Sequence, residues 1–393
     1  MLKSLGKFVR NSFARLDKTV LTCSLLITLM SLITIFSARE NFGNSKFVMQ
    51  LAMTLVGMCA MLVLVHIDYR IFVERYWHIL WFASLGLLAI TLIIGDTGAN
   101  GTESANKSWL TIIKIGSRSF QIQPSEFVKI AFIISFSKHL SSVKKEINKI
   151  KTLIPLAIHA GAIVGLILLS GDLGVAVVYV GIIAIMLAFA GLSRWYFIGA
   201  VGAVAVIFPF LWGFLSEYQQ KRILIGFQPE LDPSGYGMQP LLSLDAISAG
   251  GFFGRDIGSG GFYEKLPASH TDFIFATYCE LFGFVGAVIF LVVLVILVMR
   301  MINLAKMCKN EFGMFICIGI AGMFIVQSVL NIGMCLAMLP VVGITLPFLS
   351  CGGSSMLATF MMFGLLHNVH AHSQGVRDAL TPDTLDIDIS LMR

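Results

Sequence analysis

Residues 284–299 read FVGAVIFLVVLVILVM, and this run contains no charged, amide or hydroxyl side chain. A bilayer core is about 30 Å thick, and an α-helix needs roughly 20 apolar residues to cross it. Extended to residues 277–299, the run reaches that length. It therefore predicts a transmembrane helix.

Nine further stretches share this apolar character. The ten stretches are 20–38, 47–66, 78–94, 126–139, 153–170, 172–190, 195–214, 277–299, 313–333 and 353–370. The composition agrees with them, because only 13% of the residues are charged, whereas soluble domains carry roughly 25%. Segments of about ten residues with alternating hydropathy, which build a transmembrane β-barrel, are absent. The predicted fold class is an all-α polytopic membrane protein with about ten transmembrane helices.

Lysine and arginine decide the orientation, because short cytoplasmic loops carry an excess of both. With both termini in the cytoplasm, the inside segments hold 18 of the 28 basic residues, against ten in the opposite orientation. We therefore expect a cytoplasmic segment at 1–19, a membrane domain at 20–370 and a cytoplasmic tail at 371–393. The first apolar stretch is expected to be retained and not cleaved as a signal. The net charge of +6 then reflects topology and does not imply nucleic-acid binding.

One long extracytoplasmic loop, at about 216–275, separates the seventh and eighth spans. It holds nine glycines between Gly226 and Gly261 and a short apolar helix candidate near 241–248. Glycine at that density permits a ligand to approach the backbone closely, although a flexible connector is the alternative. The seven cysteines show neither metal-ligand nor disulfide spacing.

Four ionisable residues are predicted near the outer ends of their spans: Glu126, Lys129, Asp172 and Glu280. Charges inside a membrane are costly and usually face a partner or a watery cavity. Glu126 and Lys129 are three residues apart, so they share a helix face and can pair. The four residues predict either a polar cavity open to the outside or structural pairs between helices, and the sequence leaves both open.

Six motifs carry a family resemblance. They are Asn106-Lys107-Ser108-Trp109, Gln123-Pro124-Ser125-Glu126-Phe127-Val128-Lys129, Gly171-Asp172-Leu173-Gly174, Gly250-Gly251-Phe252-Phe253-Gly254, His270-Thr271-Asp272-Phe273-Ile274-Phe275 and Leu346-Pro347-Phe348-Leu349-Ser350-Cys351-Gly352-Gly353-Ser354-Ser355. Through them the chain resembles the shape, elongation, division and sporulation (SEDS) family of bacterial cell-wall synthases, the RodA and FtsW type, from about Ser24 to Asn368.

The resemblance implies a ten-helix enzyme that is embedded in the lipid of the bacterial cytoplasmic membrane. At the outer face of that membrane it would polymerise lipid II into β-linked glycan strands. The resemblance also implies a class B penicillin-binding transpeptidase as partner. The compact loops favour a RodA-like role in elongation over division or sporulation. In the family, the aspartate matching Asp272 is the essential catalytic residue, and those matching Glu126, Lys129 and Asp172 are functionally important.

Glycosyl transfer from a lipid pyrophosphate needs a base for the acceptor proton and positive charge for the departing pyrophosphate. Asp272 is the candidate base, although it could instead cap the next helix or hold a divalent cation, Mg²⁺ or Mn²⁺. No organic cofactor is expected. The candidate cations for the pyrophosphate are Lys107, Lys114, Arg118, Lys129, Arg255 and Lys265.

Further residues are expected to bind substrate or support the site. Beyond Glu126, Lys129 and Asp172 they are Lys107, Trp109, Arg255, Lys265, His270, Thr271, Glu280, Ser350, Gly352, Gly353, Ser354 and Ser355. The segment 350–355 reads either as a ligand-facing loop or as a turn packed on the bundle.

The chain departs from the family pattern at Leu242, Ala268, Leu281, Thr345 and Cys351. These departures put local substrate contacts in doubt but leave Asp272 and its neighbours intact. Two other functions stay open: a flippase or transporter for a lipid-linked precursor, and a non-catalytic scaffold for a transpeptidase. The long outer loop with its carboxylate favours the enzyme.

Overall fold

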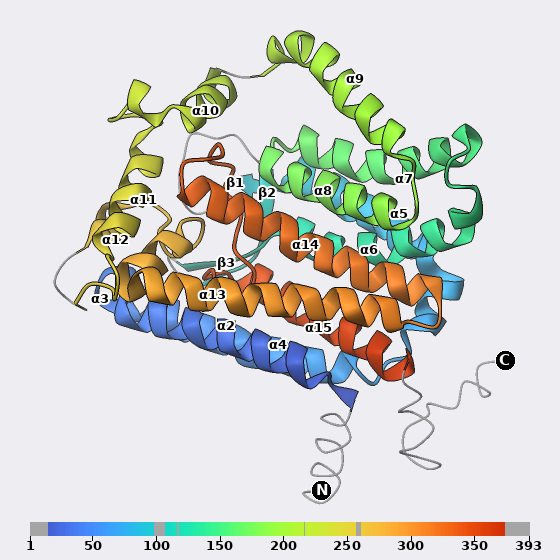
Figure 1. Ribbon diagram of the computed structural model, residues 1–393, viewed down its shortest axis with the longest axis horizontal. Coiled ribbons are helices and arrows are strands. Elements are labelled where there is room, and N and C mark those ends of the chain that lie inside the picture. The colour runs from blue at the N-terminus through green and yellow to red at the C-terminus, as the bar shows by residue number, and fades with distance from the viewer. Residues whose placement is uncertain (1–14, 98–106, 116–117, 216, 257–260, 374–393) are drawn as a thin grey trace, which may run out of the picture.

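The computed structural model describes residues 15–97, 107–115, 118–215, 217–256 and 261–373. A long helix matches each of the ten apolar stretches, and the helices form a bundle (Figure 1). They are α2 (Lys18–Ser37), α4 (Asn44–Leu64), α5 (Tyr69–Ile94), α6 (Pro124–Val143), α7 (Ile150–Leu169), α8 (Leu173–Phe189), α9 (Arg194–Trp212), α13 (Ile274–Met307), α14 (Glu311–Cys335) and α15 (Gly353–Ser373). The short helices α3 (Arg39–Phe42) and η1 (Lys144–Glu146) lie in connections between them.

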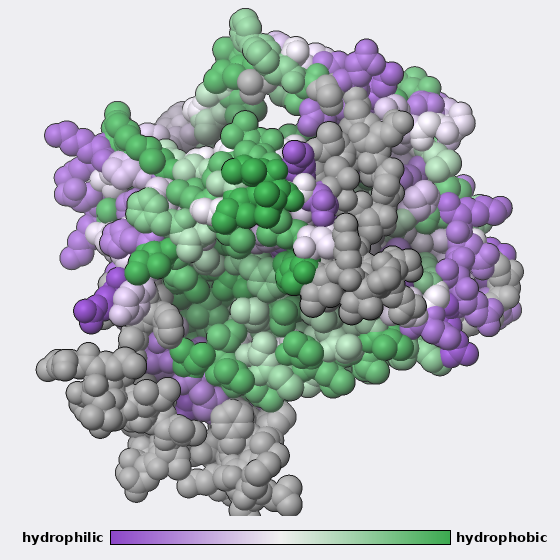
Figure 2. All heavy atoms as spheres, turned by 180° about the vertical axis from the view of Figure 1, so that it is seen from behind, coloured by the Kyte–Doolittle hydropathy of each residue, from purple (hydrophilic) through white to green (hydrophobic). Residues whose placement is uncertain are grey.

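Six of the described helices are long and apolar enough to cross a bilayer: α2, α4, α5, α7, α13 and α14. The helix α8 and residues 194–210 of α9 are apolar but shorter. Figure 2 shows an apolar band on one face of the molecule, between two hydrophilic ends. The expected all-α polytopic membrane protein is thus confirmed, while the number ten and the orientation stay predictions.

The helix α14 forms the centre of the bundle, with α13, α8, α6 and α15 packed around it. Two of its glycines allow close approach: a Cβ on Gly319 would meet Ile133 of α6, and one on Gly322 would meet Ile185 of α8. Small residues serve this purpose between membrane helices. By contrast, α9 stands apart from the bundle, and residues 195–210 are almost entirely exposed (Figure 1).

The long loop after α9 is mostly helical and forms a cap on one end of the bundle (Figure 1). It contains α10 (Glu217–Phe227), η2 (Pro229–Leu231), α11 (Met238–Ala249) and α12 (Phe262–Lys265). The helix α11 confirms the apolar helix expected near 241–248.

Two glycines of the motif 250–254, Gly250 and Gly254, allow this part of the loop to contact α13 closely. A Cβ on Gly250 would overlap the carbonyl of Cys279, and one on Gly254 would overlap that of Leu281. At this point α13 is kinked at Gly283, whose φ of +65° favours glycine. The close approach expected for a ligand is therefore used here for contact between two backbone segments.

The outer segment between α5 and α6 contains strands that the sequence did not predict. The strands β1 (Asp96–Thr97), β2 (Lys107–Ile115) and β3 (Arg118–Ile122) form a three-stranded antiparallel sheet. The core of β2, Trp-Leu-Thr-Ile-Ile, is rich in the aromatic and β-branched residues that favour strands. Short length and flanking polar residues concealed this pattern.

An ion pair closes the opposite end of the bundle. Asp17 caps α2 by accepting a hydrogen bond from the backbone N–H of Val20 (3.0 Å), and Arg300 of α13 donates to both of its carboxylate oxygens, the shortest bond being 2.6 Å. The backbone N–H of Asp17 donates to Nδ1 of His367 in α15 (3.1 Å). Burial alone would raise the pKa of Asp17, but the bonds from Arg300 and Val20 hold it below its usual value. The start of α2 and the end of α15 therefore meet at the same end.

We predict that Arg300→Gln lowers the free energy of unfolding by about 2 kcal/mol, because it leaves a buried carboxylate without its partner. Breaking a fully buried pair costs roughly 3–5 kcal/mol, and the Arg300 side chain is 31% exposed, which reduces the loss. Thermal unfolding of the detergent-solubilised protein measures it. The matched control is Lys149→Gln, whose ion pair with Glu146 is exposed on both sides. Equal melting temperatures for the two variants would contradict the assignment.

Candidate active site

Asp272 lies in the turn that leads into α13. The turn begins at Ala268, whose φ is +55° and whose carbonyl accepts hydrogen bonds from the backbone N–H groups of Thr271 (3.0 Å) and Phe273 (3.2 Å). The N-cap of α13 is Phe273, without a side-chain cap. The alternative role of Asp272 as an ordinary helix cap is therefore wrong, and the residue is half-buried in the turn.

Arg222 of α10 is the basic residue that acts on Asp272. Both side chains approach Gly343, where a Cβ would lie 3.5 Å from Oδ2 of Asp272 and 3.7 Å from Nη2 of Arg222. The φ of Gly343 is +70°, so the backbone of this position favours glycine. Arg222 was not among the cations expected from the sequence. Arg222 is hard to single out in the sequence, because it is one of two adjacent basic residues, Lys221 and Arg222.

The surroundings of Asp272 change its acidity. Burial raises its pKa, Arg222 opposes the rise, and the like charge of Asp172 adds to it, so that the pKa reaches about 6. Burial disfavours the ionised form of a carboxyl group. A carboxylate with a pKa near 6 is a better base than an ordinary aspartate and is still ionised at pH 7.

Asp172 caps α8 and lies between Asp272 and α6. Its Oδ1 accepts a hydrogen bond from the backbone N–H of Val175 (3.1 Å), and its Oδ2 accepts one from Nε2 of Gln123 (3.3 Å). Asp172 also lies near Glu126 of α6, whose charge acts on it. Asp172 is therefore within electrostatic reach of both Asp272 and Glu126.

Glu126 and Lys129 form a buried ion pair on α6, with 2.7 Å between Oε1 and Nζ. The charge of Lys129 also acts on Asp172. Of the two possibilities for these residues, the structure thus shows the structural pair. Because Lys129 is buried and paired with Glu126, its charge is not accessible to a substrate.

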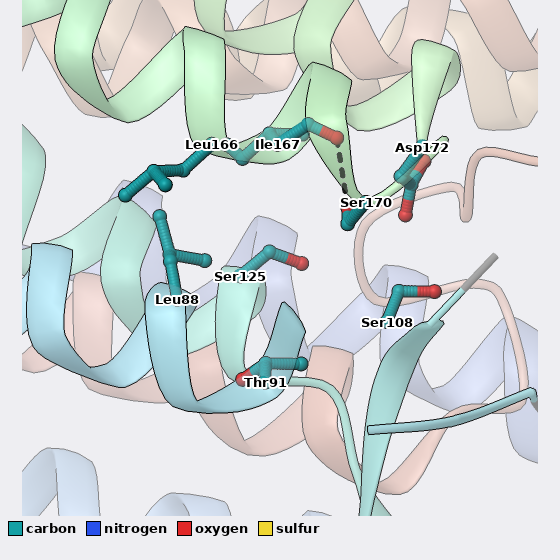
Figure 3. A pocket seen from close by; sticks show the side chains of 8 residues that line it. All are labelled: Leu88, Thr91, Ser108, Ser125, Leu166, Ile167, Ser170 and Asp172. Atoms are coloured by element: carbon teal, nitrogen blue, oxygen red, sulfur yellow. Dashed lines mark hydrogen bonds between the residues drawn. The ribbon is translucent and has the colours of Figure 1, made fainter. Parts of the chain in front are cut away.

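A pocket opens beside Asp172 (Figure 3). Its lining combines hydroxyl and apolar side chains: Leu88, Thr91, Ser108, Ser125, Leu166, Ile167, Ser170 and Asp172. The hydroxyl of Ser125 and the carboxylate of Asp172 point into the same space in Figure 3. Within the described part of the chain, the buried Ser125 hydroxyl has no hydrogen-bond partner. The pocket gives the cluster a polar opening.

The segment 350–355 packs against the Asp272 turn. The hydroxyl of Ser350 donates to the carbonyl of Thr271 (2.6 Å), and the backbone N–H of Cys351 donates to the carbonyl of His270 (2.9 Å). Ser354 accepts a hydrogen bond from the backbone N–H of Gln123 (3.2 Å), which joins this segment to the start of α6. Of the two readings left open for the segment, the structure favours the packed turn.

Gly352, Gly353 and Ser355 are half-buried at the start of α15 and complete this turn. His270 stacks at an angle on Phe42, with 5.3 Å between ring centroids. Burial, helped by the charge of Lys46, lowers the pKa of His270 to about 4, so its ring is neutral at pH 7. These residues support the turn that carries Asp272.

Glu280 does not join the cluster. Its Oε1 and Oε2 accept hydrogen bonds from the backbone N–H groups of Phe262 (2.8 Å) and Tyr263 (2.9 Å), and Arg255 approaches Oε1 at 3.8 Å. Glu280 therefore fastens α12 to α13, and Arg255 belongs with it. Of the two possibilities left open for the four ionisable residues, Glu280 takes the structural one, because its carboxylate binds the backbone of α12 and does not face Asp172.

Three other expected residues lie on neighbouring elements. Lys107 is exposed and Trp109 half-buried on β2, and Lys265 is exposed at the end of α12. The side chains of Lys114 and Arg118 lie outside the described residues. Among the departures from the family pattern, Cys351 is buried and Leu281 packs with Ala38 and Tyr263.

Known proteins are similar to this chain along nearly its whole length. Residues 16–375 match the model of the FtsW/RodA/SpoVE family, described as cell cycle proteins. A probable peptidoglycan glycosyltransferase FtsW of Trichlorobacter lovleyi is 35% identical, over 94% of this chain and 97% of the relative. Stage V sporulation protein E of Bacillus subtilis is 34% identical, over 91% and 98%. A chain from a peptidoglycan synthase complex that coordinates polymerisation and crosslinking superposes with a TM-score of 0.77, at 28% identity over 91% and 98%.

We predict that the carboxyl band of Asp272 titrates with a midpoint near pH 6 in infrared difference spectra of wild type against Asp272→Asn. In Arg222→Gln the midpoint rises by about one pH unit, because loss of a nearby positive charge disfavours the carboxylate. Lys221→Gln is the control, since Lys221 pairs with Glu217 at 3.7 Å. A midpoint near pH 4 in wild type would contradict the raised pKa of Asp272. No difference between the two variants would contradict the effect of Arg222 on it.

Proposed function

This chain belongs to the FtsW/RodA/SpoVE family, and we propose that it is a peptidoglycan glycosyltransferase that polymerises lipid II into β-1,4 glycan strands. The single observation that carries the proposal is a carboxylate with a pKa of about 6 beside a guanidinium, at the capped end of a membrane bundle. Glycosyl transfer from a lipid pyrophosphate requires both groups: a base for the acceptor proton and a positive charge for the departing pyrophosphate.

Asp272 acts as the general base. Its carboxylate accepts the proton of the acceptor hydroxyl while that oxygen attacks the anomeric carbon of the donor sugar. The bond between that carbon and the pyrophosphate oxygen breaks, and attack from the opposite side turns an α-linked donor into a β-linked product. Asp172 raises the basicity of Asp272 through its like charge.

Arg222 stabilises the departing pyrophosphate. Arginine presents a planar fork of donors that matches phosphate oxygens and keeps its charge at every physiological pH. Its place beside Gly343, on the same side as Oδ2 of Asp272, lets base and leaving-group cation act on one substrate. A positively charged group is most effective where negative charge develops in the transition state.

The lipid chain of the substrate needs an apolar path to this end of the bundle. The exposed surface of α9 offers one, with large apolar side chains that include Ile198, Val201, Val204 and Phe208. Because α9 stands apart from α14 and α8 (Figure 1), lipid can lie along it. The pocket at Ser125 is adjacent to Asp172 and has room for about one water molecule.

A divalent cation, Mg²⁺ or Mn²⁺, is a further proposal. Among the described residues, no group of three or more His, Cys, Asp or Glu side chains is arranged to hold a metal ion. Magnesium is nevertheless often held by one or two carboxylates together with substrate phosphates, so Asp272 and the pyrophosphate would be the donor set if Asp272 held the ion in place of acting as the base. When bound, the ion would neutralise part of the pyrophosphate charge.

The proposed setting is the outer face of the bacterial cytoplasmic membrane, with a class B penicillin-binding transpeptidase as partner. The structural relative in a synthase complex supports a partner of this kind. Exposed apolar residues along α13, among them Val288, Val292, Val295 and Met299, provide surface for a transmembrane helix or for lipid. A RodA-like role in elongation stays a prediction, since the FtsW and stage V sporulation relatives, at 35% and 34% identity, are at least as similar as the MrdB relative at 31%.

We predict that Asp272→Asn lowers polymerisation of fluorescent lipid II by about 10²–10⁴-fold, the usual contribution of a general base. In wild type, the rate rises with pH through about pH 6, because the base works only when ionised. Polymer on a gel, made by the purified chain with its partner, is the measurement. Full activity of Asp272→Asn would support a scaffold, and lipid movement across proteoliposomes without polymer would support a flippase.

We predict that Arg222→Gln lowers kcat by about 10²–10³-fold, as loss of one strong transition-state contact does. Lys221→Gln is the matched control, because this neighbour on α10 is 54% exposed and pairs with Glu217. The same polymerisation assay compares the two variants. An equal effect of both would mean that α10 contributes only general positive charge.

A further inference from the structure

Three consecutive carbonyl groups of the Asp272 turn accept hydrogen bonds from the last part of the chain. The carbonyl of His270 accepts from the backbone N–H of Cys351, and that of Thr271 from the hydroxyl of Ser350. The carbonyl of Asp272 itself accepts from Nδ2 of Asn331 at 2.7 Å. This third donor is the one that sits on a long helix, α14.

Asn331 makes a second hydrogen bond that matters for the site. The same Nδ2 atom donates to the carbonyl of Ile344 at 2.6 Å, and the residue before Ile344 is Gly343, which lies between Asp272 and Arg222. The Asn331 side chain is fully buried. One amide thus joins the catalytic turn to the segment beside which the carboxylate and the guanidinium meet.

Neither of the joined segments is fixed by secondary structure of its own. Residues 268–273 form an irregular turn, and residues 340–346 have no helix or strand. Non-helical backbone at membrane depth is tolerated where protein satisfies its polar groups. Asn331 ties both segments to α14, the central helix, which packs against four other long helices.

We infer that Asn331 is a positioning residue for the reaction, holding the Asp272 turn and the Gly343–Ile344 segment in register so that Asp272 and Arg222 face one substrate. Asn331 does not itself touch the substrate. The inference rests on the proposed glycosyltransferase function and adds a residue to it. Because displacement of a catalytic group by about 1 Å can cost 10²-fold in rate, loss of the bridge acts on kcat more than on KM.

The chain contains a matched control for this role. Asn368 of α15 is equally buried, and its Nδ2 also bridges two carbonyls, those of Leu64 (2.6 Å) and Ile67. It lies near the end of α15, beside His367, which accepts from Asp17 at the opposite end of the bundle from Asp272. Replacing either asparagine removes the same chemical bridge, but only one bridge is at the site.

The experiment compares Asn331→Ala, Asn331→Asp and Asn368→Ala with wild type, in complex with the transpeptidase partner. Thermal unfolding reports folding, and lipid II polymerisation gives kcat and KM separately. We expect similar losses of melting temperature in the two alanine variants. We also expect kcat to fall by about 10–100-fold in both Asn331 variants with KM within about threefold, and kcat of Asn368→Ala to stay within about twofold.

Three outcomes would overturn the inference: unchanged kcat in a folded Asn331 variant, an equal fall of kcat in Asn368→Ala, or failure of both Asn331 variants to fold while Asn368→Ala folds. The last result would make Asn331 purely structural. Failure of the proposed function itself looks different, because wild type would then make no polymer, or Asp272→Asn would make as much as wild type.

Discussion

The structure depends on one constraint: irregular backbone at the end of a membrane bundle must find hydrogen-bond partners within the protein. Helices satisfy their own backbone groups, but the turn that carries Asp272 cannot. Its carbonyls are satisfied by Ser350, Cys351 and Asn331. These three residues therefore fix the backbone of the turn as hydrogen-bond donors, and the position of the Asp272 carboxylate follows from their bonds.

The same constraint explains why the charged residues of the bundle occur in sets. Glu126 is paired with Lys129, Asp17 with Arg300, and Glu280 with two backbone N–H groups. Each of these carboxylates has its charge compensated and serves to hold helices together. Asp272 has the like charge of Asp172 beside it as well as Arg222, and its pKa reaches about 6.

Much of the fold follows from the sequence, because apolar length alone places each of the ten long helices. The motifs identify Asp272 and the Glu126–Lys129 pair, since their spacing lies within one segment. Arg222 and Asn331 were missed for a physical reason: they reach Asp272 from α10 and α14, and only tertiary packing brings these elements together. The sheet of β2 and β3 was missed because its apolar run is short. The contact of Glu280 with α12 was not predicted, because its partners are backbone N–H groups.

The kink at Gly283 has a mechanical consequence. The N–H groups of Phe284 and Val285 donate to the carbonyls of Gly251 and Phe252, so the cap supplies acceptors just after the kink. Detaching the cap would leave both donors stranded in an apolar medium, which is costly. We therefore expect the cap and this stretch of α13 to move together, so that a displacement of the cap also displaces the helix that follows the Asp272 turn.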